Sequence, residues 1–528
     1  MSRTALVLGG DVDALVSALA LARRNTPVTL VVEEPAALAR LALVEVAKGF
    51  RAPALHHAGG ADLAALAAAV RGRRRRRSGI EPAAPPLLVP GRDGAAALAL
   101  GKTLTVIGGE PPAGLAARYD SYAAIVQRSS AFLSRLAARA PLTLVEPVTR
   151  QLLATVAPGL AWLRMPAVHR NELMAFMPAP AADVLGDRLG DSRAASALAG
   201  VAAHATSVGP MQPGTATLLL HAAATGGFPQ ATTWPSGGLA TAGEALLEAV
   251  RAAGVEILVN EPIAALLEDG PRAVGAVTAR GTELRARAVI SSLGLRRTFE
   301  LLPGCGLLGA GLLSDLRTHR DRGASARLLL ALDRLPRLRS GERELTGPEL
   351  SGCWMIDDGM EGRERAADAA RRGELPERPA LEVMLPSLSQ PDLAPAGQHV
   401  LTAWVHHAPF TPAGRAWDDV ARERLAARAV AMLEEFSPGI AASIVGSTLL
   451  APPDLETRCA LPGGHVAGGE LALDQLYSLR PSPDTCAYRT PVRGLYLTGA
   501  SCHPGAPLSG AAGLNTARAV LADLPRDC

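Results

Sequence analysis

Residues 4–34, TALVLGGDVDALVSALALARRNTPVTLVVEE, carry the pattern that decides the fold. A short apolar run at 4–8 stops at a pair of glycines, and residues 14–24 then place apolar side chains at helical spacing. A second apolar run, 28–32, ends in two glutamates. This order predicts a strand, a turn, a helix and a strand, the opening βαβ unit of a nucleotide-binding sheet. On the pattern alone, a βαβ unit that binds no ligand stays an alternative.

The same alternation returns later in the chain. The segments predicted to repeat it are helix 244–253, strand 255–259, the strand-rich piece 263–277, strand 288–291, strand 495–498 and a helix over about 513–524. Residues 111–140 predict a long helix, and residues 325–410 alternate strands with polar loops, as in a second sheet. The predicted fold class is therefore α/β, with a Rossmann-like domain built from discontinuous segments and an inserted α+β domain.

The composition excludes several classes of protein. Of the 528 residues, 48% are apolar and 20% are charged, the balance of a chain that buries a large core. Aromatic residues amount to 3% and the formal net charge is +3, so we expect no specific binding of nucleic acid. No stretch of about 18 residues is apolar enough to span a bilayer, which leaves peripheral contact with a membrane open.

Cysteine and histidine spacing argues against a metal site. The chain has six cysteines without C-x-x-C or His/Cys spacing: Cys305, Cys353, Cys459, Cys486, Cys502 and Cys528. We therefore expect neither a disulfide framework nor bound metal, and a reducing, cytoplasmic location. His56–His57 and His406–His407 are adjacent pairs, whose side chains would point to opposite faces of a strand.

Residues 71–90 have a composition of their own. Six arginines fall within 71–77, namely Arg71, Arg73, Arg74, Arg75, Arg76 and Arg77. Four prolines follow, at Pro82, Pro85, Pro86 and Pro90. Because like charges repel and proline interrupts regular structure, this segment predicts a solvated loop. A basic patch for anionic lipid, nucleic acid or an acidic partner is the alternative, although no aromatic or amphipathic helix accompanies it.

Two glycine-rich turns lie at opposite ends of the chain, at Gly9–Gly10 and within 499–513. Each is predicted to join a strand to a helix, so each can direct helix N-terminal amides at an anion or an electron-rich ring. Either turn alone is a weak signal. Together with residues 244–291 they predict one nucleotide-binding domain.

Motifs along nearly the whole chain resemble the phytoene desaturase-like FAD-dependent oxidoreductases. The C-terminal ones are Gly463-Gly464-His465, Leu473-Asp474-Gln475-Leu476, Arg480-Pro481, Thr490-Pro491, GLYLTGA at 494–500, His503-Pro504-Gly505, Ser509-Gly510 and Gly513-Leu514-Asn515. Earlier ones are Gly49-Phe50-Arg51, GPMQPGTA at 209–216, WPSGGL at 234–239 and the segment 385–399.

The resemblance implies a flavin-binding sheet domain that holds an extended FAD, and an inserted substrate domain. Gly9 matches the first glycine of G-x-G-x-x-G, with Gly10 beside it, and Glu33 lies near the acidic position that binds the adenosine ribose. The backbone at Ile263 matches the strand that contacts adenine. The turn beside the pyrophosphate and ribityl chain, and the helix start facing the flavin ring, correspond to Gly499, Ala500, Leu508, Ser509, Gly510 and Gly513.

The chain departs from the family pattern at the pyrophosphate. Asp11 stands at the second glycine, where the backbone approaches the phosphates, and Ala14 stands at the third. The Gly-Gly pair expected near 35–40 is missing, and the C-terminal glycine run is reduced to 505–507, Gly-Ala-Pro. Asp11 has two reasonable orientations: it points into the pyrophosphate site, or it folds back and caps the helix. In both cases FAD occupancy is expected to be low.

Three polar residues have a possible chemical role. His503, in the C-terminal turn, is a weak candidate for proton transfer, and a loop-shaping histidine is the preferred interpretation. Ser236 and Ser509 lack a matching base and acid, which disfavours a hydrolase. Cys502 is interpreted as a packing residue.

We expect residues 1–70, 235–300 and 455–528 to form the FAD-binding domain, 71–90 a loop, and 91–234 with 301–454 the substrate domain. The predicted function is transfer of a hydride between an apolar small molecule and FAD. A flavin-poor relative that acts as a binding or scaffolding protein is the alternative. The substrate, the electron acceptor and the oligomeric state are not predicted.

Overall fold

The computed structural model describes residues 4–33, 43–55, 82–83, 86–143, 148–201, 203–227, 234–235, 238–304, 308–506 and 509–524. Several residues singled out in the sequence lie outside these ranges: His56, His57, the arginines of 71–77, Ser236, Cys305, Leu508 and Cys528.

A five-stranded sheet is assembled from distant parts of the chain, in the order β10-β2-β1-β14-β22. Its strands are β1 (Ala5–Leu8), β2 (Val28–Val32), β10 (Glu256–Val259), β14 (Ala288–Ser291) and β22 (Leu495–Leu497). All four neighbouring pairs are parallel. The fold class is thus confirmed, since the strands come from three separate stretches, as the apolar runs predict.

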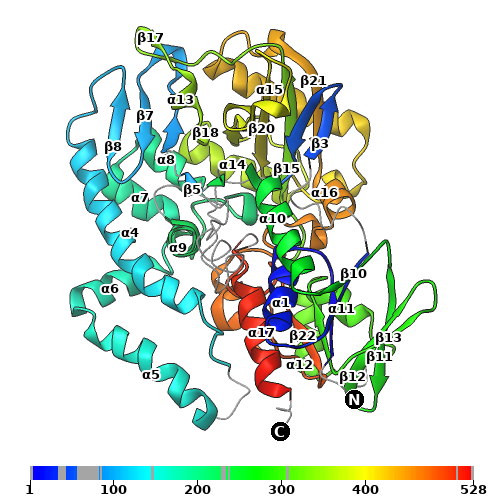
Figure 1. The fold of residues 1–528 in the computed structure, drawn as a ribbon. Coiled ribbons are helices and arrows are strands. Elements are labelled where there is room, and N and C mark those ends of the chain that lie inside the picture. Colours follow the sequence, from blue (N-terminus) through cyan, green and yellow to red (C-terminus); the bar gives the residue numbers. More distant parts are fainter. Residues whose placement is uncertain are drawn as a thin grey trace.

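Two helices pack on this sheet, α1 (Val12–Ala22) and α17 (Ala511–Asp523), and α10 (Gly238–Ala252) packs on α1. Figure 1 shows α1 and α17, the first and last helices of the chain, lying side by side. Both helices begin directly after glycine-containing turns, so their N-termini come together at one edge of the sheet.

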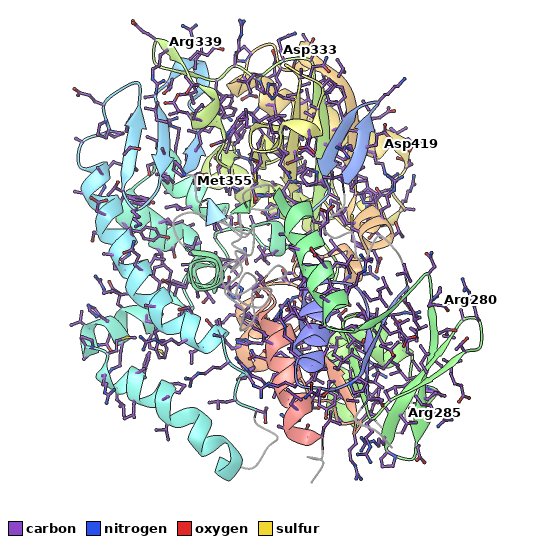
Figure 2. The ribbon with its side chains drawn as sticks, viewed as in Figure 1. Arg280, Arg285, Asp333, Arg339, Met355 and Asp419 are labelled. Atoms are coloured by element: carbon purple, nitrogen blue, oxygen red, sulfur yellow. The ribbon has the colours of Figure 1, made fainter. Side chains whose placement is uncertain are left out.

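A small antiparallel sheet extends from the same part of the molecule. It consists of β11 (Ile263–Asp269), β12 (Arg272–Thr278) and β13 (Glu283–Arg285). Arg280 and Arg285 project outward from it (Figure 2). The first residue of β11, Ile263, is buried against the parallel sheet and becomes important for the site.

An eight-stranded sheet forms the second half of the molecule, in the order β21-β15-β20-β19-β18-β6-β7-β8. Its strands are β6 (Leu87–Val89), β7 (Ala97–Leu100), β8 (Leu104–Ile107), β15 (Ser325–Leu332), β18 (Trp354–Ile356), β19 (Leu381–Met384), β20 (His399–His406) and β21 (Ile444–Leu450). Met355 of β18 lies in the interior, whereas Asp333, Arg339 and Asp419 lie at the periphery (Figure 2).

One predicted boundary differs from the structure. The loop expected over 71–90 does not extend to residue 90, because β6 lies buried inside the large sheet. Leu87, Leu88 and Val89 are all apolar, and their burial next to β18 and β7 offsets the proline-rich composition around them. The expected long helix at 111–140 is present as α4 (Leu115–Ala137).

Shorter elements complete the fold. The remaining helices are α5 (Val148–Arg164), α6 (Ala167–Phe176), α7 (Ala181–Leu189), α8 (Arg193–Ala199), α9 (Ala216–Ala222), α11 (Leu295–Glu300), α12 (Ala310–Thr318), α13 (Gly347–Leu350), α14 (Gly359–Arg371), α15 (Asp419–Phe436) and α16 (Pro452–Cys459). The remaining strands are β3 (Leu43–Ala47), β4 (Phe50–Pro53), β5 (Pro82–Ala83), β9 (Trp234–Pro235), β16 (Arg339–Ser340) and β17 (Arg343–Glu344). Within the described ranges, none of the helices combines the length and apolar character needed to cross a bilayer.

Candidate functional site

A cleft of about 590 Å³ opens at the carboxyl ends of β1, β2 and β14. One wall consists of the turn Gly9–Gly10, of Glu33 and of the turn that begins at Ser292. The other wall comes from Arg322, Phe410 and residues 460–463. In open parallel sheets, ligands bind at this edge, because helix N-termini and strand-end turns converge there.

The cleft's turns at Gly9 and Ser292 approach each other closely, and the C-terminal glycine turn lies beside them. Gly9 has a φ of 106°, and a Cβ placed on it would lie 2.1 Å from Oγ of Ser292. Gly499, after β22, has a φ of 92°, and its Cβ would lie 2.9 Å from Oδ2 of Asp11. Both positions therefore require glycine, for backbone conformation and for space. The two glycine turns of the sequence do meet in space.

Asp11 is folded back onto the helix that it precedes. Its Oδ1 accepts a hydrogen bond of 2.8 Å from the amide of Ala14, so Asp11 is the N-cap of α1. Its side chain is buried and still lines the cleft. Of the two predicted orientations, the structure has the second. An N-terminal amide of the helix that would otherwise face an anion is thus satisfied by the protein's own carboxylate.

Glu33 and Ile263, both predicted to face the adenosine, contact each other. The amide of Ile263 donates a hydrogen bond of 2.9 Å to Oε1 of Glu33. Arg297 adds to this arrangement: its Nη2 lies 3.8 Å from the same Oε1 and donates to the carbonyl of Ile263 at 3.3 Å. Both backbone groups of Ile263 therefore have protein partners in this structure.

Two amides at the N-terminus of α17, the helix start that the resemblance places at the flavin ring, have protein partners. The amide of Gly513 donates a hydrogen bond of 3.0 Å to Oδ1 of Asp13, and the amide of Ala511 donates to Oγ of Ser509 at 3.2 Å. A Cβ on Gly513 would lie 2.3 Å from the carbonyl of Asp13, and one on Gly510 would lie 2.9 Å from Val16. These two glycines thus allow α1 and α17 to pack closely.

Arg480 shapes the C-terminal turn. The sequence shows it only as part of the Arg480-Pro481 motif and does not indicate this role. Its side chain is fully buried and donates hydrogen bonds to backbone carbonyls, among them those of Glu470 at 3.1 Å and Ala500 at 3.0 Å. Burial lowers the pKa of Arg480 to about 10. The residue joins the turn after β22 to the loop that precedes it, so it positions Ala500. Only the tertiary structure reveals these carbonyl partners.

His503 lies in the same turn and is buried. Its Nε2 is 3.2 Å from the carbonyl of Leu136, and its own carbonyl accepts a hydrogen bond of 2.9 Å from the hydroxyl of Tyr488. Burial lowers the pKa of His503 to about 4, so the imidazole is neutral near neutral pH. The backbone contacts favour a loop-shaping role. Proton transfer by His503 stays a prediction.

The contacts and burial of the remaining candidate site residues favour structural roles for them. Oγ of Ser509 accepts a hydrogen bond from the amide of Ala511, the first residue of α17, and donates one to the carbonyl of Ala506. Burial keeps the pKa of the Cys502 thiol well above its usual range, so the thiol stays protonated. Among the described residues there is no group of three or more His, Cys, Asp or Glu side chains that could hold a metal. His221, which sequence reasoning missed, is buried with a pKa lowered to about 3 by desolvation, Arg480 and His503.

The cleft gives a phosphate close access to the backbone, but its charge suits FAD less well. Gly9, Gly10 and Gly294 lack side chains at the wall that a phosphate would approach. Five carboxylates line the cleft: Asp11, Glu33, Glu300, Asp321 and Glu456. Three arginines accompany them: Arg296, Arg297 and Arg322. Arg296 forms an ion pair with Asp321 at 3.1 Å, which neutralises part of the positive charge of the cleft. A dinucleotide could therefore enter, with Asp11 opposing its pyrophosphate.

Comparisons with known proteins agree with the fold. No protein-family model matches the chain. Over 385 residues it is 32% identical to rat (Rattus norvegicus) pyridine nucleotide-disulfide oxidoreductase domain-containing protein 2; this match covers 70% of the chain and 65% of the relative. It is 28% identical over 278 residues to the lycopene-forming phytoene desaturase of a Paracoccus species, covering 51% of each.

Solved structures resemble the whole chain at low identity. A putrescine oxidase structure matches with a TM-score of 0.60 and 12% identity, covering 99% of this chain and 98% of that one. Cyclohexylamine oxidase from Brevibacterium oxydans matches with a TM-score of 0.57 and 13% identity, over all of both chains. These likenesses show the fold. In sequence, the chain is similar to these curated oxidoreductases, and it spans slightly less than two thirds of the length of the rat relative.

Proposed function

We propose that this protein binds FAD and transfers a hydride between an apolar small molecule and the flavin. The observation that carries the proposal is the cleft at the carboxyl ends of β1, β2 and β14, with glycine turns at its wall and Glu33 at the end of β2. This is the place and the chemistry by which parallel sheets bind dinucleotides.

Residues of the cleft and of the neighbouring C-terminal turn each have a role in this proposal. Glu33 would bind the ribose hydroxyls, the turn Gly9–Gly10 would admit the pyrophosphate, and Gly499–Ala500 would lie beside the ribityl chain. When bound, FAD supplies the group that accepts or delivers the hydride. Arg480 donates a hydrogen bond to the carbonyl of Ala500 and would help to hold the C-terminal turn in place beside the cofactor.

The side chains of the C-terminal turn favour an uncharged substrate. His503 is neutral near pH 7 and Cys502 is protonated, and Arg480 is enclosed by carbonyl groups. These buried side chains line no part of the cleft, but they exclude water from the turn that the resemblance places beside the flavin, as hydride transfer requires. The turn offers little to a charged substrate. This supports the apolar class.

A second candidate is a relative that no longer depends on flavin and acts as a binding protein. Two observations favour it: Asp11 caps α1, and Glu33 binds the amide of Ile263. Each places a protein group where the relatives' cofactor would find a partner.

The visible absorbance of the purified protein separates these candidates. For a flavoenzyme we expect an oxidised-flavin spectrum after incubation with FAD, FAD in the denatured extract, and anaerobic bleaching by an apolar hydride donor. Charged donors of similar size should bleach it less. Calorimetric titration that shows no FAD binding at low salt would contradict the proposal and leave the binding protein.

A further inference from the structure

The imidazole of His503 is held so that one of its nitrogens presents a bare lone pair. Its Nε2 lies 3.2 Å from the carbonyl oxygen of Leu136. Because a carbonyl oxygen can only accept a hydrogen bond, Nε2 carries the hydrogen, and Nδ1 of the neutral ring carries none. This Nδ1 is buried, and it has no hydrogen-bond partner in the described part of the chain.

The surroundings of His503 fix the position of its ring. The hydroxyl of Tyr488 donates a hydrogen bond of 2.9 Å to the carbonyl of His503, and Asn515 of α17 donates to that hydroxyl at 3.0 Å. The ring of Tyr477 lies tilted beside the imidazole, with ring centroids 5.8 Å apart. A role in loop shape needs only the contacts of Nε2 and of the backbone. A buried lone pair that is held in place is, in addition, what a proton acceptor requires.

The C-terminal end of α4 (Leu115–Ala137) lies against the other nitrogen of the ring. Leu136 belongs to the last turn of this helix, whose carbonyl groups form the negative end of the helix dipole. A positive charge on the imidazole is stabilised at such a position. Burial lowers the pKa of His503 to about 4 and Arg480 lowers it further, whereas the carbonyls of Leu136 and Ala137 raise it. The ring is therefore neutral at rest, and carbonyl groups support its protonated form.

We propose that Nδ1 of His503 accepts the proton that the substrate loses when its hydride goes to the flavin. The inference rests on the proposed function, in which the C-terminal turn lies beside the cofactor. The bond between hydrogen and one substrate carbon breaks, and the hydrogen leaves with both electrons as a hydride. A neighbouring atom of the substrate releases a proton to Nδ1, and the electron pair of that bond forms the new double bond.

A weak base is sufficient for this step. Once the hydride has left, the substrate is short of electrons, and a hydrogen on the neighbouring atom is strongly acidic. A neutral imidazole with a low pKa can therefore take the proton. Because Arg480 opposes a second buried positive charge, the imidazolium readily releases the proton to water after the product has left, and the ring returns to its neutral form.

Two hydride donors separate proton transfer from hydride transfer. Cyclohexadiene loses a hydride and a proton to become benzene, whereas N-benzyl-dihydronicotinamide loses a hydride alone. In FAD-loaded protein, His503→Gln should slow anaerobic bleaching of the flavin by cyclohexadiene about 100-fold, and bleaching by the dihydronicotinamide far less. Glutamine keeps an N–H group for the carbonyl of Leu136 but has no basic nitrogen. Equal slowing with both donors, no slowing, or a wild type that only the dihydronicotinamide bleaches would overturn the inference.

His407→Gln is the matched control. His407 follows β20 in the large sheet and is likewise buried, with a ring nitrogen that has no partner among the described residues. Burial lowers its pKa to about 3. This variant loses a similar histidine away from the C-terminal turn, so both donors should bleach it as they bleach the wild type. Slowing with cyclohexadiene equal to that of His503→Gln would overturn the inference.

NMR of isotope-labelled histidine nitrogens tests the tautomer in the protein without FAD. We expect the signals of His503, identified by their loss in His503→Gln, to show a hydrogen on Nε2 and none on Nδ1. A hydrogen on Nδ1 would overturn the inference and leave the proposed function intact. Wild-type protein that binds no FAD would overturn the proposed function and the inference together, so the two failures are distinguishable.

Discussion

The carboxylate of Asp13 accepts a hydrogen bond of 3.0 Å from the amide of Gly513, and so ties the first helix of the chain to the last. Both residues are buried, and Ser17 strengthens the junction by donating to the carbonyls of Asp13 at 2.8 Å and Gly513 at 3.2 Å. The junction fixes the two helix N-termini at the edge of the sheet where the cleft opens. Its integrity is therefore a condition for the site.

Asp13→Ala should destabilise the fold. It leaves the buried amide of Gly513 without this acceptor, which costs about 1–3 kcal/mol. Asp13→Asn keeps an acceptor oxygen and should cost less. Urea unfolding of the three proteins measures the difference. Equal stability of Asp13→Ala and the wild type would show that another group or water satisfies the amide.

Asp11→Asn should raise FAD affinity without loss of stability, because asparagine also caps helices well. A carboxylate about 5 Å from a phosphate costs about 3 kcal/mol at an effective dielectric near 20. Removing it should tighten binding by about two orders of magnitude, and more at low salt than at high salt. Calorimetric titration with FAD measures the change, and Asp11→Gly serves as a second variant. Tightly held, stoichiometric FAD in the wild type would contradict the prediction.

Gly510→Ala should destabilise the protein more than Gly254→Ala. Both glycines have positive φ, 68° and 80°, so the backbone strain is similar. Only the Cβ at 510 meets a neighbour, Val16 at 2.9 Å, while the one at 254 has open space. The difference, about 1–3 kcal/mol, isolates the packing of α1 on α17. Thermal melting detects it, and identical melting temperatures would mean that the helices move apart at little cost.

Acidification should destabilise the fold through its buried histidines. Burial lowers the pKa of His503 to about 4 and that of His407 to about 3, from 6.5. Below pH 6.5 these histidines bind protons in the unfolded chain but stay neutral in the folded chain. The free energy of unfolding therefore falls with pH until the pH reaches the pKa of the folded state. Each residue contributes about 1.4 kcal/mol per pH unit in that window. His503→Gln should lower the slope of the free energy of unfolding against pH by the equivalent of about one proton. Urea unfolding between about pH 6.5 and 4.5 measures this slope. An unchanged slope would mean that His503 is protonated in the folded state.

The local pattern predicts the parallel sheet well. The apolar runs at 28–32 and 288–291 coincide with β2 and β14, because a strand buried on both faces leaves a continuous apolar stretch in the sequence. The family motifs likewise identify which turns meet at the cleft. The strand at 87–89 is not evident from the sequence, because the prolines and arginines around it indicate a loop.

The sequence by itself determined the element types, the parallel sheet and the resemblance to a known family. It also showed that Asp11 is a departure from the glycine fingerprint, but it left both orientations open. Only the tertiary structure decided that Asp11 caps α1 and that Glu33 binds the amide of Ile263. It also decided that the amide of Gly513 donates a hydrogen bond to Asp13. The physical reason is that the periodicity of apolar residues reflects burial, which depends on the polarity of each side chain by itself. A hydrogen bond needs two groups within about 3 Å, and these partners are separated by as many as 500 positions along the chain.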